Sequence, residues 1–351
     1  MSATATLGKA EALPRDAAEL SLSLDGETPV FCFSAAALEK RARTFLNGFK
    51  GEVSFAVKSN PSKDVISTLA RAGISAWDVA SVPEIDLVHS IQRKGHIHYH
   101  NPVKSLREIT RAYREFGVRR YCVDAREELA KIASVVGDDR NIEVAVRFVL
   151  PRDRGASAHD FSTKFGAPEH IAIELLKKVK AHGFIPMLTF HPGSQAKDPQ
   201  TYARHIEAAA RISKQAGVEI HRLNVGGGFP ADYEFSKAPE PEVYFRVIEI
   251  ARDQHFAGLP LPELECEPGR GLVATCMSLL TSIKLVCSDG DDIFINKGKH
   301  SIQAGVSLEQ IQSNNRGTTT AGFYAFGSLQ SFLTNQPQSF TSSVPGANTP
   351  I

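Results

Sequence analysis

The chain has 351 residues, of which 42% are hydrophobic and 23% are charged, the balance of an ordinary globular protein. Its 40 Lys and Arg residues against 39 Asp and Glu residues leave a net charge of +1, which argues against a nucleic-acid binder, because such proteins need a basic excess. No run approaches the roughly 20 apolar residues that span a bilayer, and the start lacks the apolar core of a signal peptide. The five cysteines lack metal-binding spacing. We therefore expect a cytoplasmic enzyme without a membrane partner.

Short β-branched or alternating runs recur along the chain, and the first five begin about 22 residues apart, which leaves room for a strand, a helix and two loops. We expect eight strands, at 53–57, 75–79, 97–100, 120–123, 143–149, 185–190, 222–225 and 263–266. Between them, apolar residues at three- and four-residue spacing predict helices at 61–72, 82–94, 105–116, 125–136, 168–182, 199–216 and 241–256.

This alternation of strands and helices favours parallel pairing with right-handed crossovers. Eight such units are the number that closes a (β/α)₈ TIM barrel, so the predicted class is α/β with such a barrel. A doubly wound open sheet is the alternative fold that the spacing leaves open.

The two ends of the chain fall outside the eight units. A strand-like VFCF ends the segment 21–33, and residues 277–300 predict two strands around a turn at 288–291. After residue 300 only two charged residues remain, Glu309 and Arg316. We therefore expect a flexible N-terminus at 1–20, the barrel at 40–276, a second, all-β domain built from both chain ends at 21–39 with 277–335, and a flexible tail at 336–351.

In a TIM barrel the active site lies in the loops that follow the strands, at the C-terminal face. The side chains and loops expected there include Lys58, Asp78, His100, Asp124, Arg147, His191, the glycines Gly226, Gly227 and Gly228, and Glu267 with Gly269 and Arg270. The three successive glycines let backbone N–H groups approach an anion, and the guanidinium fork that follows Gly269 suits a phosphate.

A lysine, a carboxylate, a histidine and a phosphate cradle at one barrel mouth suit pyridoxal 5′-phosphate. Lys58 is the candidate for the Schiff base, and Glu267 for the partner of the pyridine nitrogen. His191 is the candidate that lies flat on the ring. Each residue taken alone also fits an ordinary structural role.

Seven motifs occur in an order and spacing that resemble the fold-type III, PLP-dependent amino-acid decarboxylases: FAVKSNP, WDVASVPEIDLV, HNPVKS, KFG, FHPGSQ, NVGGGFP and ECEPGR. That family includes the ornithine, lysine, diaminopimelate and arginine enzymes and is related to alanine racemase. The resemblance covers about residues 30–300. It implies the barrel plus β-domain of the alanine racemase-like fold and a head-to-tail homodimer with shared active sites.

The same resemblance implies residue roles. Lys58 would carry the cofactor as an aldimine, Asp78 and Glu84 would support the site, and Glu267 would pair with the ring nitrogen. The other implied cofactor contacts are Arg147, His191, Ser194, Gly226, Gly227, Gly228, Gly269 and Arg270. The implied activity is that of a carbon–carbon lyase that decarboxylates a basic amino acid, such as ornithine or lysine, in polyamine biosynthesis.

The chain departs from the family toward its C-terminal end. The family's GPTCDS-like motif supplies a Cys acid across the dimer interface, and the best local match is FGSLQS at 326–331, in which Gln330 or Leu329 replaces the Cys and Ser331 replaces the Asp. We take Gln330 as the candidate for the catalytic position. An amide cannot replace a thiol as a general acid. Racemisation, cyclisation or transamination therefore remain alternatives to decarboxylation, as does an inactive PLP-binding homologue.

Two further patterns have competing explanations. His96, His98 and His100 alternate along one strand and would face one side, which could bind a metal. Hydrogen-bonded histidines explain the same pattern, and we predict no metal. The charged loop at 151–163 resembles a lid that closes on substrate, and an ordinary exposed loop explains it equally well.

Overall fold

The computed structural model describes residues 19–20, 29–150, 165–233 and 237–280, together with the backbone of four short strands between 295 and 341. The chain divides into two compact units, residues 32–278 and residues 1–31 with 279–351. Among the described residues, no helix is both long and apolar enough to cross a membrane.

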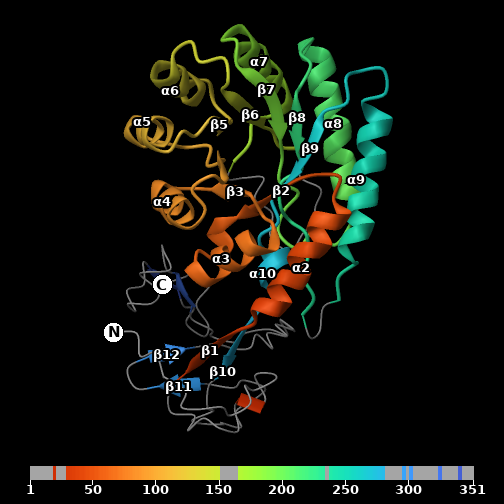
Figure 1. Ribbon diagram of the computed structural model, residues 1–351. Helices are drawn as coiled ribbons and strands as arrows, with labels where there is room; N and C mark the ends of the chain where they lie inside the picture. The colour runs from red at the N-terminus through yellow and green to blue at the C-terminus, as the bar shows by residue number, and fades with distance from the viewer. Residues whose placement is uncertain are drawn as a thin grey trace, which may run out of the picture. The chain divides into compact units, whose positions relative to one another are not determined.

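The larger unit is a closed barrel of eight parallel strands surrounded by helices (Figure 1). Its strands are β2 (Gly51–Ala56), β3 (Ala76–Val79), β4 (His96–Tyr99), β5 (Arg120–Val123), β6 (Glu143–Arg147), β7 (Ile185–Thr189), β8 (Arg222–Asn224) and β9 (Glu263–Cys266). The first and last of them close the barrel by pairing in parallel, with Val53 opposite Cys266. The predicted barrel is therefore confirmed, and the open doubly wound sheet is wrong.

The seven predicted helices are present on the outside of the barrel, as α3 (Lys63–Ala72), α4 (Val82–Ile91), α5 (Leu106–Glu115), α6 (Arg126–Val136), α7 (Glu169–Ala181), α8 (Gln200–Ala216) and α9 (Pro241–His255). A further helix, α2 (Ala35–Gly48), was not predicted. It begins where the Ser34 hydroxyl accepts a hydrogen bond from the backbone N–H of Ala37, and it buries Leu38, Ala42 and Phe45. Most of the apolar core lies between the strands and these helices.

The interior of the barrel is largely polar. The Arg120 guanidinium on β5 lies 3.0 Å from Glu265 on β9 and 2.7 Å from Glu52 on β2. Since these strands are not neighbours in the sheet, the contacts must cross the inside of the barrel. A small apolar cluster of Cys122, Ala145 and Met187 is separate from the main core. The interior therefore places charged groups beneath the C-terminal face.

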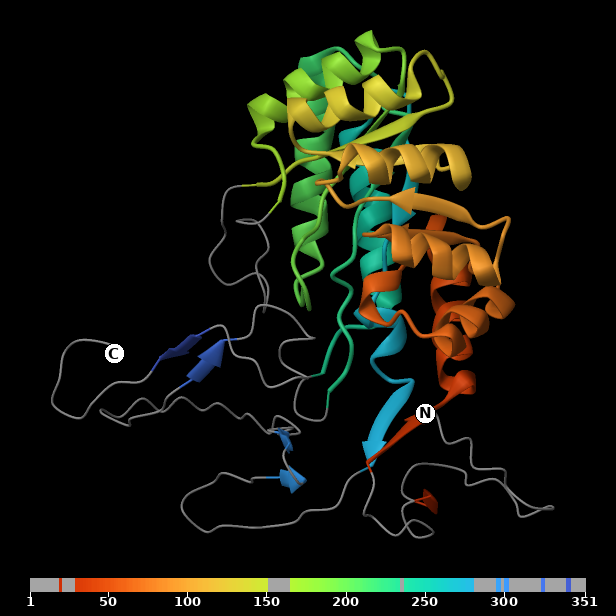
Figure 2. The same cartoon turned by 90° about the vertical axis from the view of Figure 1, so that its left-hand side faces the viewer.

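The remaining described strands form two-stranded sheets. Strands β1 (Val30–Phe33) and β10 (Met277–Leu280) form one, and both views show them side by side (Figures 1 and 2). Strand β11 (Ile295–Lys297) pairs antiparallel with β12 (His300–Ile302), and β13 (Phe323–Ala325) with β14 (Ser339–Thr341). The last strand lies in the segment expected to be a flexible tail. The predicted turn at 288–291, the loop at 151–163 and Gln330 lie outside the described residues.

Candidate functional site

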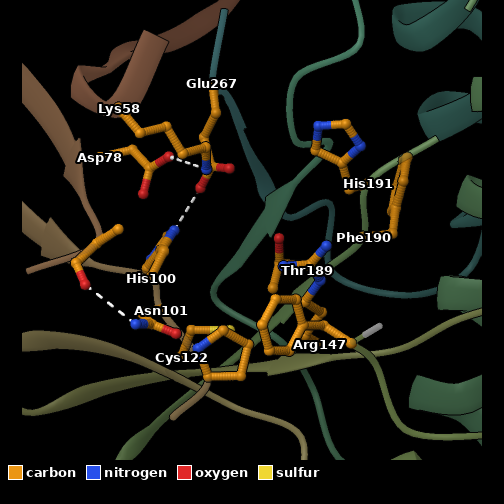
Figure 3. Close-up of a pocket in the computed structure, with 13 residues that line it drawn as sticks. Lys58, Asp78, His100, Asn101, Cys122, Arg147, Thr189, Phe190, His191 and Glu267 are labelled. Carbon is orange, nitrogen blue, oxygen red and sulfur yellow. Dashed lines mark hydrogen bonds and ion pairs between the residues drawn. The ribbon is translucent and has the colours of Figure 1, made fainter. Parts of the chain in front are cut away.

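A pocket of about 340 Å³ opens at the C-terminal ends of the barrel strands (Figure 3). That volume lies within the range of small-molecule sites, roughly 300–1,000 Å³. Five predicted site residues line it: Lys58, Asp78, Arg147, His191 and Glu267. The remaining lining residues are Ala80, His100, Asn101, Pro102, Cys122, Phe165, Thr189 and Phe190.

Lys58 lies in a one-turn 3₁₀ helix, η1 (Val57–Ser59), immediately after β2. Its amino group lies 3.2 Å from Oδ2 of Asp78, whose side chain is 2% exposed. The Asp78 charge raises the pKa of Lys58, and it outweighs the opposite effect of burial. Without a partner molecule the amine is thus held as a cation at the mouth of the barrel. Its side chain is 55% exposed and so remains accessible.

Glu84 does not line the pocket but braces its wall. It lies in the first turn of α4, and its Oε2 accepts a hydrogen bond of 2.7 Å from the backbone N–H of Ala80, which does line the pocket. A similar brace links two other predicted features, because Oδ2 of Asp124 accepts a hydrogen bond from Gly166 in the KFG motif. These carboxylates therefore shape loops around the pocket.

His191 is held as a neutral ring. Burial lowers its pKa to about 3, and the nearby positive charges of Arg147 and Lys58 act in the same direction. The backbone N–H of Gly193 donates to Nδ1 at 3.1 Å, so a neutral ring that accepts this bond carries its proton on Nε2. The result is a flat aromatic group in the pocket, without charge at physiological pH.

This suppressed ionisation predicts a loss of stability in acid. The folded protein keeps His191 neutral down to about pH 3, whereas the unfolded chain takes up a proton below the ordinary pKa of 6.5. The unfolded state then binds more protons, so stability falls as the pH is lowered through this window. When the pH is lowered from about 7 to about 5, the free energy of unfolding of the wild-type protein should fall by up to about 2 kcal/mol more than that of His191→Phe. Urea unfolding at the two pH values measures this difference. Equal losses in the two proteins would contradict the assignment.

The predicted phosphate loops border the pocket but do not line it. A side chain at Gly228 would meet the carbonyl oxygen of Gly193 at 2.4 Å, so the glycine loop lies directly against the loop that leads into Ser194. A side chain at Gly269 would meet Ser59 at 3.0 Å, which places that loop against the turn of the candidate lysine. Arg270 begins the short helix α10 (Arg270–Val273) and donates to the hydroxyl of Tyr233 at 2.6 Å.

The glycine loop also contacts the floor of the pocket. A side chain at Gly227 would meet the carbonyl oxygen of Glu267 at 2.7 Å and Nε2 of His191 at 3.3 Å. The carbonyl oxygen of Gly227 accepts a hydrogen bond from the hydroxyl of Tyr202 at 2.7 Å. The loop is thus fixed from both sides, and it brings bare backbone next to two predicted site residues.

Gly226→Ala should damage both the fold and the site. Gly226 has a φ of +67°, and an added Cβ would lie 2.1 Å from the carbonyl oxygen of Phe190. Gly217 offers a matched control, because its φ is +63° and nothing lies within 4 Å of an added Cβ. Gly217→Ala should lower the free energy of unfolding by about 1–2 kcal/mol, the cost of a side chain in the left-handed region. Gly226→Ala should lower it by about 1–3 kcal/mol more, because the added Cβ is also overpacked. Urea unfolding measures the difference, and equal costs would contradict the close packing.

Two residues that contact Glu267 received no role at the site from the sequence, although His100 was expected at the active-site face. His100 was considered only as a strand-end residue and as part of a histidine row, and its Nδ1 hydrogen-bonds Oε1 of Glu267. Asn224 is the first residue of the NVGGG motif, and its Nδ2 donates to Oε1 of Glu267 at 2.7 Å while its Oδ1 accepts from the backbone N–H of Gly226 at 2.8 Å. The position of Asn224 in that motif could have indicated a role at the site. Only the folded structure shows that its side chain points toward Glu267.

The HNPVKS motif is explained by a buried lysine. Lys104 is 1% exposed, and its amino group donates to the carbonyl oxygens of Asn101 at 2.7 Å and Cys122 at 2.8 Å. It also forms an ion pair of 3.1 Å with Glu128. Since Asn101 and Cys122 both line the pocket, this lysine fixes part of its wall from behind.

The histidine row is divided among three carboxylates. His96 contacts Glu52 at 3.1 Å, His98 contacts Glu265 at 2.7 Å, and His100 contacts Glu267. Within the described part of the chain, two groups of three buried residues have ligand atoms close enough for a metal, namely His98, His100 and Glu265, and Asp78, His100 and Glu267. In each group the carboxylates already face a cationic neighbour, Arg120 in the first and Lys58 in the second. The geometry thus favours the hydrogen-bonding explanation of the row.

The pocket also fits pyridoxal 5′-phosphate chemically. His100 and Asn224 both contact Oε1 of Glu267, no described residue donates a hydrogen bond to Oε2, and this second oxygen faces the pocket (Figure 3). An acceptor is therefore available for a protonated ring nitrogen. Lys58 supplies an amine, and neutral His191 supplies a flat face. The bare glycine backbone lies beside them.

Comparison with known proteins identifies the relatives of this chain. The model of the pyridoxal-dependent decarboxylase family, pyridoxal binding domain, matches residues 35–274. The lysine/ornithine decarboxylase of Selenomonas ruminantium is 33% identical over 237 residues, which are 66% of this chain and 58% of that protein. Antizyme inhibitor 2 of Xenopus laevis is 32% identical over 65% of this chain and 49% of that protein. The chain thus spans about half the length of these curated relatives.

Solved structures give the same result. The crystal structure of lysine decarboxylase from Selenomonas ruminantium has a TM-score of 0.65 at 28% identity, over 78% of this chain and 70% of that chain. A structure of SrLDC in complex with PLP and cadaverine also has a TM-score of 0.65 and 28% identity, and it covers 78% of this chain and 68% of that chain. The likeness therefore extends beyond the matched family model.

Proposed function

This chain belongs to the pyridoxal-dependent decarboxylase family, its cofactor is pyridoxal 5′-phosphate, and from that premise we propose that it removes the α-carboxylate of a basic amino acid. The observation that carries the proposal is the meeting of Lys58, Asp78 and Glu267 in one pocket at the C-terminal ends of the strands. This set offers an amine, a charge that holds it and an acceptor for the cofactor ring.

Different residues would hold different parts of the cofactor. Lys58 would bind it covalently through its amine, and Glu267 would accept a hydrogen bond from its ring nitrogen. His191 would lie against the ring as a neutral group. The glycines Gly226, Gly227 and Gly228, with Ser194, Gly269 and Arg270, would take the phosphate, and Arg147 would lie near the ring. When bound, the cofactor supplies an electron-withdrawing ring that accepts the electron pair released when the bond to the carboxylate breaks.

The protein's own side chains prepare this chemistry. Asp78 holds the Lys58 ammonium in place at 3.2 Å, so the amine is positioned before substrate arrives. Phe165, Phe190 and Pro102 give part of the pocket an apolar wall, and the lower local dielectric constant beside such a wall strengthens the electrostatic effect of Glu267. Arg147 adds a positive charge to the pocket, complementary to a carboxylate or a phosphate.

A basic substrate of the lysine or ornithine kind is the finer part of the proposal. The name of the Selenomonas ruminantium relative supports it. We also propose a homodimer with shared active sites and a role in polyamine biosynthesis, as the family resemblance implies. In that arrangement Gln330 would approach the cofactor of the partner subunit. Sedimentation equilibrium should show a dimer, and a monomer at enzymatic concentrations would remove this part of the proposal.

One experiment tests the cofactor link. Borohydride reduction of the holoprotein, followed by peptide mapping, should leave the pyridoxyl group on Lys58. Lys63, which begins α3 and is exposed, serves as the internal control for non-specific labelling. A label on another lysine, or none in cofactor-saturated protein, would overturn the assignment.

A second experiment tests the reaction. The holoprotein is incubated with a panel of L- and D-amino acids, and CO₂, amines, ketones and enantiomers are measured. Release of CO₂ with an equal amount of amine from lysine or ornithine supports the proposal. Racemised, cyclised or transaminated products without CO₂ would replace it with another reaction of the same bound cofactor.

A non-enzymatic role is the second candidate. One relative is named antizyme inhibitor 2 rather than for an activity, so family membership alone does not require turnover. A protein that binds the cofactor on Lys58 but converts none of the amino acids would favour this candidate. The two candidates thus share the labelling result and differ in the product analysis.

A further inference from the structure

Among the residues that the structure describes, the carboxylate of Glu267 has two hydrogen-bonding partners, and both bind the same oxygen. Nδ1 of His100 and Nδ2 of Asn224 lie in hydrogen-bonding contact with Oε1, the second at 2.7 Å. All three side chains are buried, with exposed fractions of 8% for Glu267, 7% for His100 and 0% for Asn224. Oε1 is therefore fully used, and Oε2 is the oxygen left for a ligand.

The two partners differ in one chemical property. The Asn224 amide is a neutral donor that cannot take up or release a proton near neutrality, and it is fixed by its second bonds to Gly226 and Glu265. The His100 imidazole is a base with an ordinary pKa close to that of a pyridine nitrogen. A pocket that holds a pyridine ring against Glu267 thus contains two similar bases beside one carboxylate.

The surroundings of His100 favour its cationic form. Burial by itself would lower the pKa of His100, but Glu267, Glu265 and Asp78 outweigh burial and raise it. Conversely, burial opposes ionisation of Glu267, and His100 lowers the pKa of that carboxyl. The other charged groups near the pair are Lys58, which lies toward Asp78, and His98, whose pKa is lowered well below its ordinary value by burial and Arg120.

We propose that His100 is a positioning residue that holds Oε1 of Glu267 and competes with the cofactor's ring nitrogen for the single proton that this carboxylate stabilises. The inference rests on the proposed function, because it requires the ring nitrogen at Oε2. When the ring nitrogen carries the proton, His100 is neutral and its remaining N–H, on Nδ1, still donates to Oε1. When His100 carries the proton, both of its ring nitrogens are protonated and the cofactor's ring nitrogen is not. Protonation of both bases would place two positive charges on either side of the one carboxylate that both contact, and their repulsion in a buried site is costly.

The competition sets how strongly the ring withdraws electrons. With the proton on the ring nitrogen the ring is the stronger acceptor of electrons, and with the proton on His100 it is the weaker one. His100 therefore tempers the reaction that Glu267 alone would promote. A cofactor ring that accepts electrons weakly favours reactions in which the released electron pair is consumed at once. The position of the proton therefore influences which of the candidate reactions this pocket supports.

The test reads the ring nitrogen directly. Holoprotein is prepared with cofactor labelled with ¹⁵N in the ring, and the ¹⁵N resonance is recorded for wild type, His100→Asn and His98→Asn. Asparagine at position 100 keeps a neutral donor near Nδ1 and removes the competing base. We expect His100→Asn to move the resonance toward that of protonated pyridine. His98 is the matched control, since it lies in the same row but contacts Glu265, and its replacement should leave the resonance in place.

Two outcomes overturn the inference. One is a resonance that does not move in His100→Asn, which would reduce His100 to a hydrogen-bond donor that asparagine replaces. The other is a shift in the opposite direction. Should His100→Asn fail to fold, wild-type holoprotein remains decisive: the ring nitrogen and the His100 imidazole should titrate together, and a ring nitrogen that stays fully protonated while His100 titrates would refute the competition.

The failure of this inference is distinguishable from that of the proposed function. Borohydride labelling of Lys58 in the same samples establishes whether the cofactor is bound where the function requires it. Labelled Lys58 with an unmoved resonance removes only the role of His100. Absence of the label removes the proposed function itself.

Discussion

Lys58→Arg is expected to lower kcat/KM for CO₂ release by at least about 10²–10⁴-fold, the range for loss of a positioned proton-transfer group. Arginine keeps the positive charge that Asp78 faces at 3.2 Å, so the pocket should stay folded. A guanidinium is protonated at all physiological pH values and is a poor nucleophile, so it cannot bind the cofactor covalently. The variant therefore separates the charge of Lys58 from its chemistry.

The measurements are CO₂ release with the best amino acid of the panel, the visible absorption of the bound cofactor and the borohydride label. Lys63→Arg is the matched control, because it makes the same change at an exposed helix start near the pocket lysine in sequence. It should retain wild-type activity. Substantial turnover by Lys58→Arg would show that another group does the work assigned to Lys58.

Lys104→Met is expected to lower the free energy of unfolding by about 3–5 kcal/mol, the cost of breaking a buried ion pair from one side. Methionine matches the length of the side chain but removes the partner of Glu128 and the donor to two carbonyl groups. Glu128 is itself only 4% exposed, so its charge would lose its buried cation and keep only the partly exposed Lys131 as a partner. Urea unfolding of wild type and variant measures the loss.

Two further variants sharpen this prediction. Lys131 also pairs with Glu128, at 2.6 Å, but its side chain is 31% exposed, so Lys131→Met should cost about 1 kcal/mol or less. Adding Glu128→Gln to Lys104→Met removes the uncompensated charge, and the double variant should be more stable than Lys104→Met alone. Equal losses for Lys104→Met and Lys131→Met would show that burial of the pair contributes nothing.

Much of the fold could be predicted because each barrel unit is local. A strand and the helix after it span about 22 residues, and their apolar periodicities are visible within that window. Helix ends were readable for the same reason: Ser62 and Ser105 accept hydrogen bonds from the first turns of α3 and α5. Strand β6 ended earlier than expected, because Phe148 bridges to Ala167 instead of continuing the ladder. That partner lies beyond the local window.

The candidate site was predictable in part. Once a barrel is assumed, the residues that follow each strand must gather at one face, and Lys58, Asp78, Arg147, His191 and Glu267 do line one pocket. The roles of His100 and Asn224 were missed. Each lies far from Glu267 in sequence, by 167 and 43 residues respectively, and no local pattern says which carboxylate a buried donor will face.

The sequence by itself determined the order and kind of the elements, the location of the reactive face and the need for glycine at 226–228, since these depend on periodicity, strand ends and backbone freedom. Only the tertiary structure decided that β2 and β9 close the sheet, that Lys104 is buried, and that His96, His98 and His100 each contact a different carboxylate. The physical reason is that each partner lies outside the local window of one strand and one helix. The contacts of His98 and His100 reach β9 or the loop after it, those of Lys104 reach β5 and α6 of the next unit, and closure of the sheet brings these groups together.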